Sequence, residues 1–240
     1  MAYALIARCP RSGQLGIGIA SYSIAAGLYC DGALRANTGA TLTQGAPNPR
    51  NNYLAISLLA QGRTAKQALA ELLANDSDCE YRQVAVVDRE NQAAAYSGDR
   101  VRGWAGCRTG NGFAALGDML AGEQVLDALV TGFEAAPQAG LDERLLAALE
   151  SAGGVGGMAG ARGRLPERSA ALIVWGGRTY NEIDIRVDLH ERAIEELRRI
   201  YGDYMPSIAY YEERARNPRN AIPAMEFADM LKAGRAREAG

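Results

Sequence analysis

Short apolar runs occur in pairs along much of this chain, and a polar or glycine-containing turn separates the two members of each pair. The first two runs are Tyr3 to Arg8 and Leu15 to Ser21, with Gly13 in the turn between them. Runs of this length and spacing predict β-hairpins. We expect further strand pairs over these residues: 27–45 with a break near 37–39, 81–98, 103–120, and 170–177 with 181–188.

Between the strand pairs, apolar positions recur at the spacing of a helix. Residues 49–76 predict two helices that are interrupted at Gly62, and the second helix is expected to begin after a Thr64 cap. The Gly-rich segment 153–169 is expected to be a long loop. Further helices are expected over 123–136, 141–153 and 190–200.

The strands therefore come as adjacent pairs and do not alternate singly with helices. This order disfavours a doubly wound parallel sheet and predicts antiparallel sheets with helices packed outside. We expect an α+β fold in which two mainly antiparallel sheets stack and each carries a helix pair, as a four-layer α/β/β/α sandwich. Residues 1–200 are expected to form this domain, and residues 201–240 a helical C-terminal extension.

Composition and charge exclude several classes of partner. Hydrophobic residues make up 48% of the chain, and 26 basic residues are interspersed with 28 acidic ones. Nucleic-acid binding needs a concentrated basic surface, so nucleic acid is not expected as a partner. No apolar run reaches the length of a membrane span, and the N-terminus lacks the pattern of a signal peptide. We therefore expect no membrane partner and a cytoplasmic location.

Cysteine and histidine are too sparse for common metal and triad chemistry. The four cysteines contain no CxxC pair, and His190 is the one histidine, so we predict no zinc site and buried, reduced thiols. His190 lies at an expected helix start, which favours a capping or surface role over catalysis. Asp184, Arg186 and Asp188 predict a salt-bridge ladder, with a metal site of Asp184, Asp188 and His190 as the alternative. We expect neither a metal nor a cofactor.

Polar side chains gather where the expected strands end. Hydroxyl and amide groups in such places can bind an oxyanion or a substrate, although they also cap loose backbone groups. The candidates from this pattern are Ser21, Ser23, Thr43, Gln44, Arg82 and Asp118. The Gly-rich segment lacks the features of a phosphate-binding loop, but it could act as a lid that brings in Arg162 and Arg164.

Several stretches, taken in order, resemble successive blocks of the bacterial domain of unknown function 1028. These stretches are YALIARCPRSGQLGIGIAS, GATLTQGAPNP, EYRQVAVVD, GWAG, ALGDMLAG, RSAALIV and IDIRVDLHERAIEELRRI. They cover about the first two hundred residues. The family is regarded as Ntn-hydrolase-like, so the resemblance implies the four-layer sandwich and a catalytic residue at the start of the first strand.

In Ntn hydrolases this first residue is Thr, Ser or Cys, and its own α-amine acts as the base. An α-amine titrates near neutral pH, which makes a catalytic histidine unnecessary. Family members commonly begin Met-Thr, whereas this chain has Ala2, whose methyl group has no oxygen or sulfur. The resemblance places Ala2 at the nucleophile position. Ser21 and Asp118, taken from the polar groups at strand ends, are the other expected catalytic residues. The expected substrate-binding residues are Ser23, Thr43, Gln44, Asn48 and Arg82.

Ala2 leaves three explanations open. The first is that the chain is an engineered, inactive form of an amidase. The second is that it is a natural member that kept the pocket and lost the reaction. The third is that it uses another group, with water activated by the terminal amine or by Asp118. Ala2 is small enough to permit removal of Met1, and a retained Met1 would leave no free amine at position 2.

The main functional hypothesis is an amidohydrolase that cleaves an amide C–N bond in a small nitrogen compound. One alternative is a small-molecule binding protein on the same scaffold without catalysis. The other is a cell-wall or protein interaction module, because residues 198–219 are rich in Tyr and Arg as recognition surfaces are. The same segment could instead pack on its own domain or on a second subunit, and a homodimer is expected.

Overall fold

The computed structural model describes residues 1–176 and 182–238, with side chains as far as residue 234. The chain divides into two compact units, Met1–Leu197 and Arg198–Gly240. Among the helices of the described residues, none combines the length and apolarity that a bilayer crossing requires. The first unit is mixed α and β and contains two antiparallel sheets, so the predicted α+β class is confirmed.

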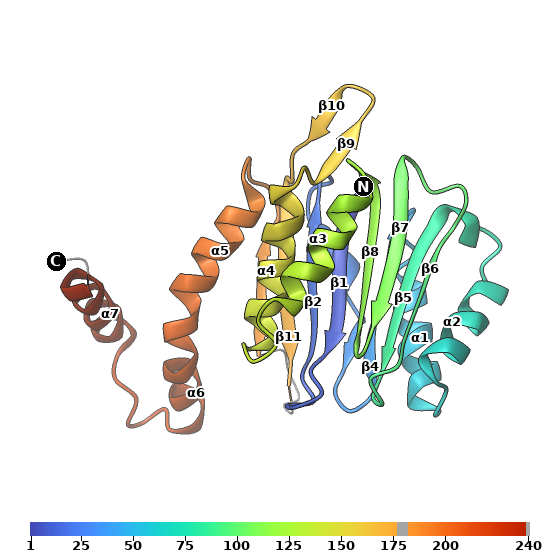
Figure 1. The fold of residues 1–240 in the computed structure, drawn as a ribbon. Coiled ribbons are helices and arrows are strands. Elements are labelled where there is room, and N and C mark those ends of the chain that lie inside the picture. The colour runs from blue at the N-terminus through green and yellow to red at the C-terminus, as the bar shows by residue number, and fades with distance from the viewer. Residues whose placement is uncertain (177–181, 239–240) are drawn as a thin grey trace. The chain divides into compact units, whose positions relative to one another are not determined.

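The larger sheet has eight strands, and its order places the first strand near the centre (Figure 1). Along the sheet the order is β10-β9-β8-β1-β2-β11-β12. The eighth strand, β7, lies off this path and pairs with β8. The strands are β1 (Ala2–Arg8), β2 (Leu15–Ser21), β7 (Trp104–Gly110), β8 (Phe113–Leu120), β9 (Met158–Gly160), β10 (Gly163–Leu165), β11 (Ser169–Trp175) and β12 (Ile183–Val187). The predicted hairpins β1–β2 and β7–β8 and the pair β11–β12 are confirmed. Residues 177 and 181, at the inner ends of that last pair, lie outside the described residues.

The smaller sheet has four strands in chain order, and two helices pack on it. Its strands are β3 (Leu34–Arg35), β4 (Gly39–Gly45), β5 (Arg82–Asp88) and β6 (Ala93–Ser97). Helices α1 (Arg50–Ala60) and α2 (Ala65–Ala74) cover its outer face through an apolar cluster shared with Val84 and Val86. The predicted Thr64 cap is present as a capping box with Gln67.

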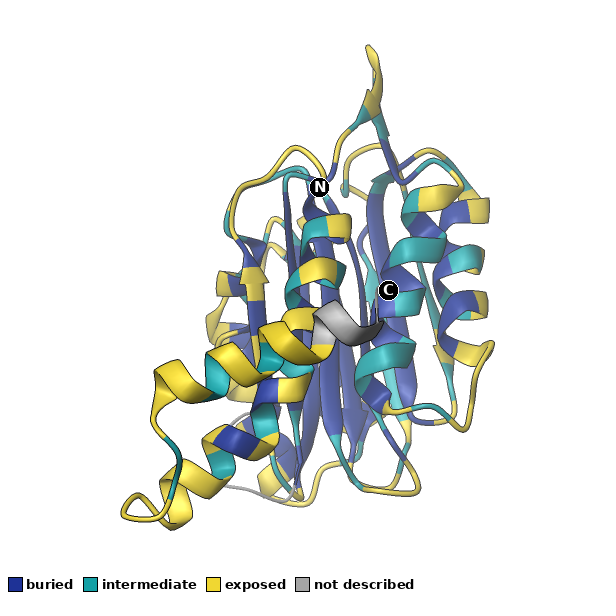
Figure 2. Ribbon diagram, turned by 90° about the vertical axis from the view of Figure 1, so that its left-hand side faces the viewer, coloured by how far each residue is buried: buried dark blue, intermediate teal, exposed yellow. Residues whose placement is uncertain are grey.

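Helices α3 (Glu123–Glu134) and α4 (Leu141–Gly154) cover the outer face of the larger sheet (Figure 1). Glycine in β2 lets the backbone of α4 approach the sheet, because a Cβ at Gly18 would lie 3.2 Å from the Leu145 carbonyl oxygen. Almost every residue of β1 and β2 is buried, on both faces of the strands, which explains why their sequences are almost continuously apolar. Figure 2 shows the same burial through the strands of this unit.

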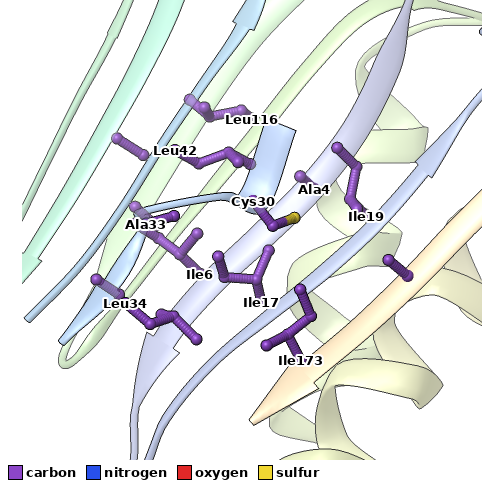
Figure 3. Close-up of a cluster of buried hydrophobic side chains, with 14 of the residues drawn as sticks. Ala4, Ile6, Ile17, Ile19, Cys30, Ala33, Leu34, Leu42, Leu116 and Ile173 are labelled. Atoms are coloured by element: carbon purple, nitrogen blue, oxygen red, sulfur yellow. The ribbon is translucent and has the colours of Figure 1, made fainter. Parts of the chain in front are cut away.

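The inner faces of the two sheets pack against each other. The cluster between them includes Ala4 and Ile6 of β1, Ile17 of β2, Leu42 of β4 and Leu116 of β8 (Figure 3). A short 3-10 helix, Ala26–Cys30, adds Ala26 and Cys30 to this cluster. It occupies the start of the first strand expected within 27–45, so that strand is shortened to β3, which pairs with β4 as expected.

The prediction of a long loop at 153–169 is wrong in part. Helix α4 ends at Gly154, and β9 and β10, each of three residues, then form a hairpin in which Met158 of β9 lies opposite Leu120 of β8. A contact made across such a distance in sequence leaves no mark in the local pattern of apolar residues. Arg164 binds the buried carboxylate of Glu167 at 3.3 Å.

The second unit is helical, as its sequence predicts. Helix α5 (Ala193–Tyr204) crosses the boundary between the two units, and a 3-10 turn (Met205–Ser207), α6 (Ile208–Arg216) and α7 (Ala224–Glu238) follow. Within this unit the rings of Tyr210 and Phe227 stack with centroids 3.9 Å apart.

Candidate functional site

The start of β1 lies between the ends of its two neighbours in the sheet. The antiparallel register sets Ala2 opposite Ser21 at the end of β2, and Tyr3 opposite Gly117 of β8. Asp118, the next residue of β8, is thereby brought beside Ala2 although 116 positions separate them in sequence. Three of the predicted catalytic positions, Ala2, Ser21 and Asp118, therefore lie together.

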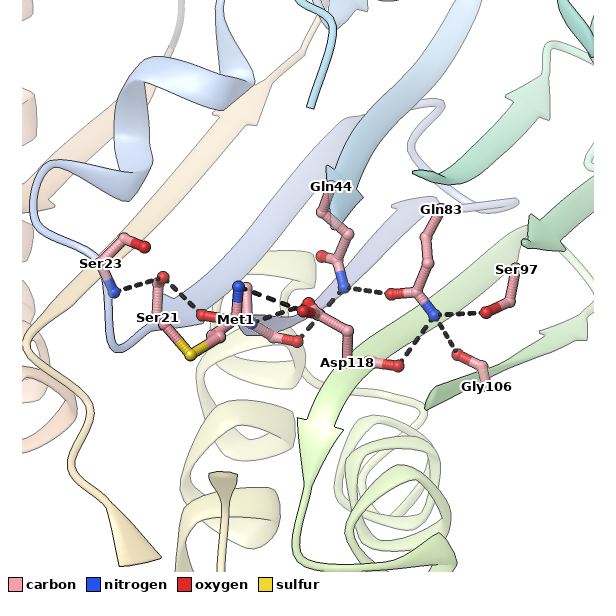
Figure 4. A network of polar contacts seen from close by, with 10 residues as sticks. Met1, Ser21, Ser23, Gln44, Gln83, Ser97, Gly106 and Asp118 are labelled. Carbon is pink, nitrogen blue, oxygen red and sulfur yellow. Dashed lines mark hydrogen bonds and ion pairs between the residues drawn. The ribbon is translucent and has the colours of Figure 1, made fainter. Parts of the chain in front are cut away.

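Asp118 binds the backbone nitrogens of the first two residues. Its Oδ1 accepts the Ala2 N–H at 2.9 Å, and its Oδ2 lies 3.1 Å from the Met1 ammonium (Figure 4). Only 3% of Asp118 is exposed, and this burial raises the pKa of its carboxyl above the usual range, although the ammonium and the Ala2 N–H oppose the shift. The site thus contains a buried acidic group whose pKa is perturbed, as active sites commonly do.

Ser21 holds the first peptide group from the other side. Its hydroxyl donates to the Met1 carbonyl at 2.7 Å and accepts the Ser23 N–H at 3.0 Å. The Tyr22 N–H also donates to the Met1 carbonyl, at 3.3 Å. The Ser21 hydroxyl therefore bonds to backbone groups on both sides, and it holds residue 1 and the loop that carries Ser23 in place.

Two buried glutamines of the smaller sheet reach across to the larger one. Gln44 Nε2 donates to the Ala2 carbonyl at 3.2 Å and to Gln83 Oε1 at 2.8 Å. The Gln83 Nε2 group lies within hydrogen-bonding distance of Ser97 Oγ (2.9 Å), the Gly106 carbonyl (3.0 Å) and the Gly117 carbonyl (2.8 Å), as Figure 4 shows. Gln83 and Ser97 were not expected from the sequence, where each looks like an ordinary strand residue.

A cavity of about 370 Å³ opens beside these groups. Its lining comprises Met1, Ser23, Gly45, Ala46, Tyr81, Arg100, Arg102, Asp118 and Met119. Met119 directly follows Asp118 and has φ +54°, an uncommon backbone conformation for a residue other than glycine. Such outliers concentrate at functional sites. The volume suits a small organic molecule.

Ser23 lines this cavity, but the other four predicted substrate-binding residues do not: they are Thr43, Gln44, Asn48 and Arg82. Thr43 pairs with Val84, whose side chain packs on α1 and α2, so the Thr43 hydroxyl lies on the outer face of the sheet, opposite to Gln44. The Arg82 guanidinium binds Asp76, with Nε 2.6 Å from Oδ2, and the Ala46 carbonyl. Asn48 Oδ1 accepts the Arg50 N–H at 3.3 Å.

The residues near His190 bind one another. Arg186 Nε lies 2.7 Å from Asp184 Oδ1, as expected for a salt bridge, and His190 Nδ1 accepts the Arg192 N–H at 3.1 Å near the start of α5. Within the part of the chain that the structure describes, no three His, Cys, Asp or Glu side chains gather in a way that could hold a metal ion.

Comparison with known proteins identifies relatives of unknown function. A crystal structure of protein SPO2555 from Silicibacter pomeroyi, described as DUF1028, superimposes with a TM-score of 0.75. It is 28% identical and covers 85% of this chain and 88% of its own. None of the curated proteins matches the chain. Residues 2–197, nearly all of the first unit, match the model of a family of unknown function (DUF1028), and the chain therefore belongs to that family.

Proposed function

We propose that the first unit is a four-layer Ntn-hydrolase-like sandwich and that its cavity at Met1 and Asp118 binds a small amide. The packing order supports the fold assignment: a helix pair, the smaller sheet, the larger sheet and a second helix pair. The position of Ala2, at the start of β1 in the larger sheet and in the cluster between the two sheets, supports the location of the site.

One observation carries the proposal, namely the contact between Asp118 and the backbone nitrogen of residue 2 at 2.9 Å. If Met1 is removed, this nitrogen becomes an α-amine that remains bonded to a buried carboxylate. An amine held in this way can accept a proton near neutral pH, which is the role of the N-terminal residue in an Ntn hydrolase.

Ala2 excludes the covalent part of that mechanism because its methyl group cannot attack a carbonyl carbon. We propose that the chain retains the amide-binding site of an amidohydrolase and lacks its nucleophile. A second candidate is hydrolysis by a water molecule that the amine or Asp118 activates. The raised pKa of Asp118 favours this candidate, because a carboxylate with a raised pKa is a better general base at neutral pH.

The test compares the parent chain with Ala2→Thr and Ala2→Val. Thr and Val have nearly the same shape, so the pair isolates the hydroxyl from the effect of added volume in a buried position. Each protein is checked for Met1 removal by intact mass, then assayed for ammonia or amine release from small amides, lactams and ureido compounds. We expect thermal shifts with at least one compound in all three proteins and turnover only in Ala2→Thr.

Other results separate the candidates. Turnover by the parent, lost in Asp118→Asn, would favour water activation. No turnover by Ala2→Thr or by the smaller Ala2→Ser, with no thermal shift in any protein, would exclude an amide site.

We also propose a cytoplasmic homodimer. The free state of Cys9, Cys30, Cys79 and Cys107 supports a reducing compartment. The mass of the full chain in solution, compared with a chain that ends after Tyr201, tests the dimer and the role of the tail. A monomeric full chain would exclude the homodimer. A folded, truncated chain that is still a dimer would exclude a dimer that the tail forms.

A further inference from the structure

The loop between β6 and β7 brings two arginines to the cavity. This loop comprises residues 98–103, and a backbone hydrogen bond holds it at each arginine. The Arg100 N–H donates to the Glu80 carbonyl at 2.9 Å, and the Arg102 carbonyl accepts the Met119 N–H at 3.2 Å. Both arginines line the cavity. Their backbone positions are thus set before any ligand binds, which lowers the entropy cost of binding.

The two arginines differ in their partners. Arg100 Nε lies 2.9 Å from a Glu80 carboxylate oxygen, and its Nη1 donates to the Tyr81 hydroxyl at 2.7 Å. For Arg102, no carboxylate among residues 1–176 and 182–234 lies within ion-pair distance. Arg102 is exposed and lines the cavity, so its charge and its planar set of N–H donors are available to a ligand there.

The charges around the cavity favour an anion. Its lining has three cationic groups, namely the Met1 ammonium, Arg100 and Arg102, and one carboxylate, Asp118. That carboxylate is bound to the Met1 ammonium, and Glu80 neutralises Arg100. The charge of Arg102 is left for the ligand.

A carboxylate fits this arrangement better than a phosphate. One guanidinium can bind both oxygens of a carboxylate through two parallel N–H bonds. Tight phosphate sites commonly add several backbone N–H groups, as at a helix N-terminus. The Ala46 and Met119 N–H groups of the cavity lining are already bonded to the Tyr81 and Arg102 carbonyls.

We propose that the ligand of this cavity is a small amide that also carries a carboxylate, with the carboxylate bound by Arg102. The amide half of this statement rests on the proposed function, whereas the carboxylate half rests on Arg102 and the charges around it. The acid group selects among amides, and Arg102 is the residue that determines this selectivity.

The test measures the binding of matched ligands to the full chain by calorimetry. Succinamate has an amide and a carboxylate, butanamide has only the amide, and succinate has only carboxylates. Malonamate and glutaramate vary the distance between the two groups by one carbon in each direction. We expect the best ω-amide acid of the series to bind at least about tenfold more tightly than butanamide, the effect of one charge-assisted bidentate contact. Added salt should weaken that binding.

Arg102→Gln should reduce the affinity for the acids to that of butanamide and leave butanamide unchanged. Arg102→Lys should recover part of the loss, since it restores the charge without the planar fork. Arg89→Gln is the matched control, because Arg89 is also exposed and forms its ion pair with the neighbouring Glu90 in the turn between β5 and β6.

Three results would overturn the carboxylate proposal. They are no binding by any acid in the series, equal binding of acids and butanamide, and acid binding that Arg102→Gln leaves intact. Tighter binding of inorganic phosphate than of succinate, lost in Arg102→Gln, would also overturn it. If succinate binds through Arg102 as tightly as succinamate, the carboxylate subsite stands and the proposed amide function fails.

Discussion

The space between the two sheets has an apolar middle and a polar end, and the same strands build both. In the middle, Ile6 of β1, Ile17 of β2 and Leu42 of β4 pack in one apolar cluster (Figure 3). At the end where β1 begins, the same layer contains Asp118, Gln44 and Gln83 (Figure 4). In the middle, the two sheets therefore pack through apolar contacts.

The polar end therefore needs an explanation other than sheet packing. A buried polar group destabilises the fold unless it is hydrogen-bonded, and even then its net gain is small. The bonds of Asp118 and Gln44 converge on the nitrogen and the carbonyl of Ala2. We infer that the middle supplies stability and that the polar end fixes the backbone of residue 2 for binding.

The largest expected effect is a loss of stability from the middle. Ile17 is fully buried, and Ile17→Ala should lower the free energy of unfolding by about 3 kcal/mol because it leaves a cavity. Urea unfolding measures this change. Leu28→Ala is the control, because Leu28 is 63% exposed and its truncation should cost about 0.5 kcal/mol or less.

The same Ile17 variant should bind the best ω-amide acid as the parent does, provided that the measurement is made under conditions where it is folded. A loss of affinity comparable to that of a polar-end variant would break the division between the two regions.

A smaller effect is expected from the polar end, and here affinity should change with stability. Gln83→Leu removes the acceptor of one Gln44 bond and leaves the carbonyls of Gly106 and Gly117 without the Gln83 donor. Leaving buried groups unpaired should lower the free energy of unfolding by about 2 kcal/mol. Because Gln44 then holds the Ala2 carbonyl less firmly, ligand affinity should also fall.

A double-mutant cycle with Gln44→Leu tests whether the two glutamines act as one unit. Replacing both amides should cost at least about 1 kcal/mol less than the sum of the single losses, since the double variant has no half-bonded amide. Strict additivity would mean that the two side chains act independently.

The sequence predicts the local parts of this architecture and not its long-range contacts. The hairpin of β1 and β2 and the Thr64 capping box follow from residues a few positions apart. The pairing of β1 with β8 joins residues more than a hundred positions apart, and no local pattern encodes it. Asp118 was a candidate only because it follows an apolar run, and its contact with Ala2 needed the structure.

The missed residues have the same cause. Arg100 and Arg102 lie in a loop whose position depends on backbone bonds to Glu80 and Met119. Gln83 lies opposite Gln44 because β4 and β5 are neighbours in the sheet, although two helices separate these strands in the sequence. One error was avoidable: adjacent strand residues face opposite sides, so Thr43 and Gln44 could not both line one site.

The smallest expected effect concerns the outer face of β4, which contacts neither the apolar middle nor the polar end of the space between the sheets. Thr41 and Thr43 are both fully buried on β4, but Thr41 Oγ1 donates to the Ala85 carbonyl at 2.9 Å, whereas Thr43 Oγ1 has no partner among the described residues. Replacement by Val keeps the shape and removes the hydroxyl. Thr41→Val should lower the free energy of unfolding by about 1 kcal/mol, and Thr43→Val should raise it by about 0.5 to 1 kcal/mol. Urea unfolding of both variants measures this difference in sign. Ligand affinity should stay at the parent value in both, and a weakened affinity in Thr43→Val alone would return Thr43 to the site.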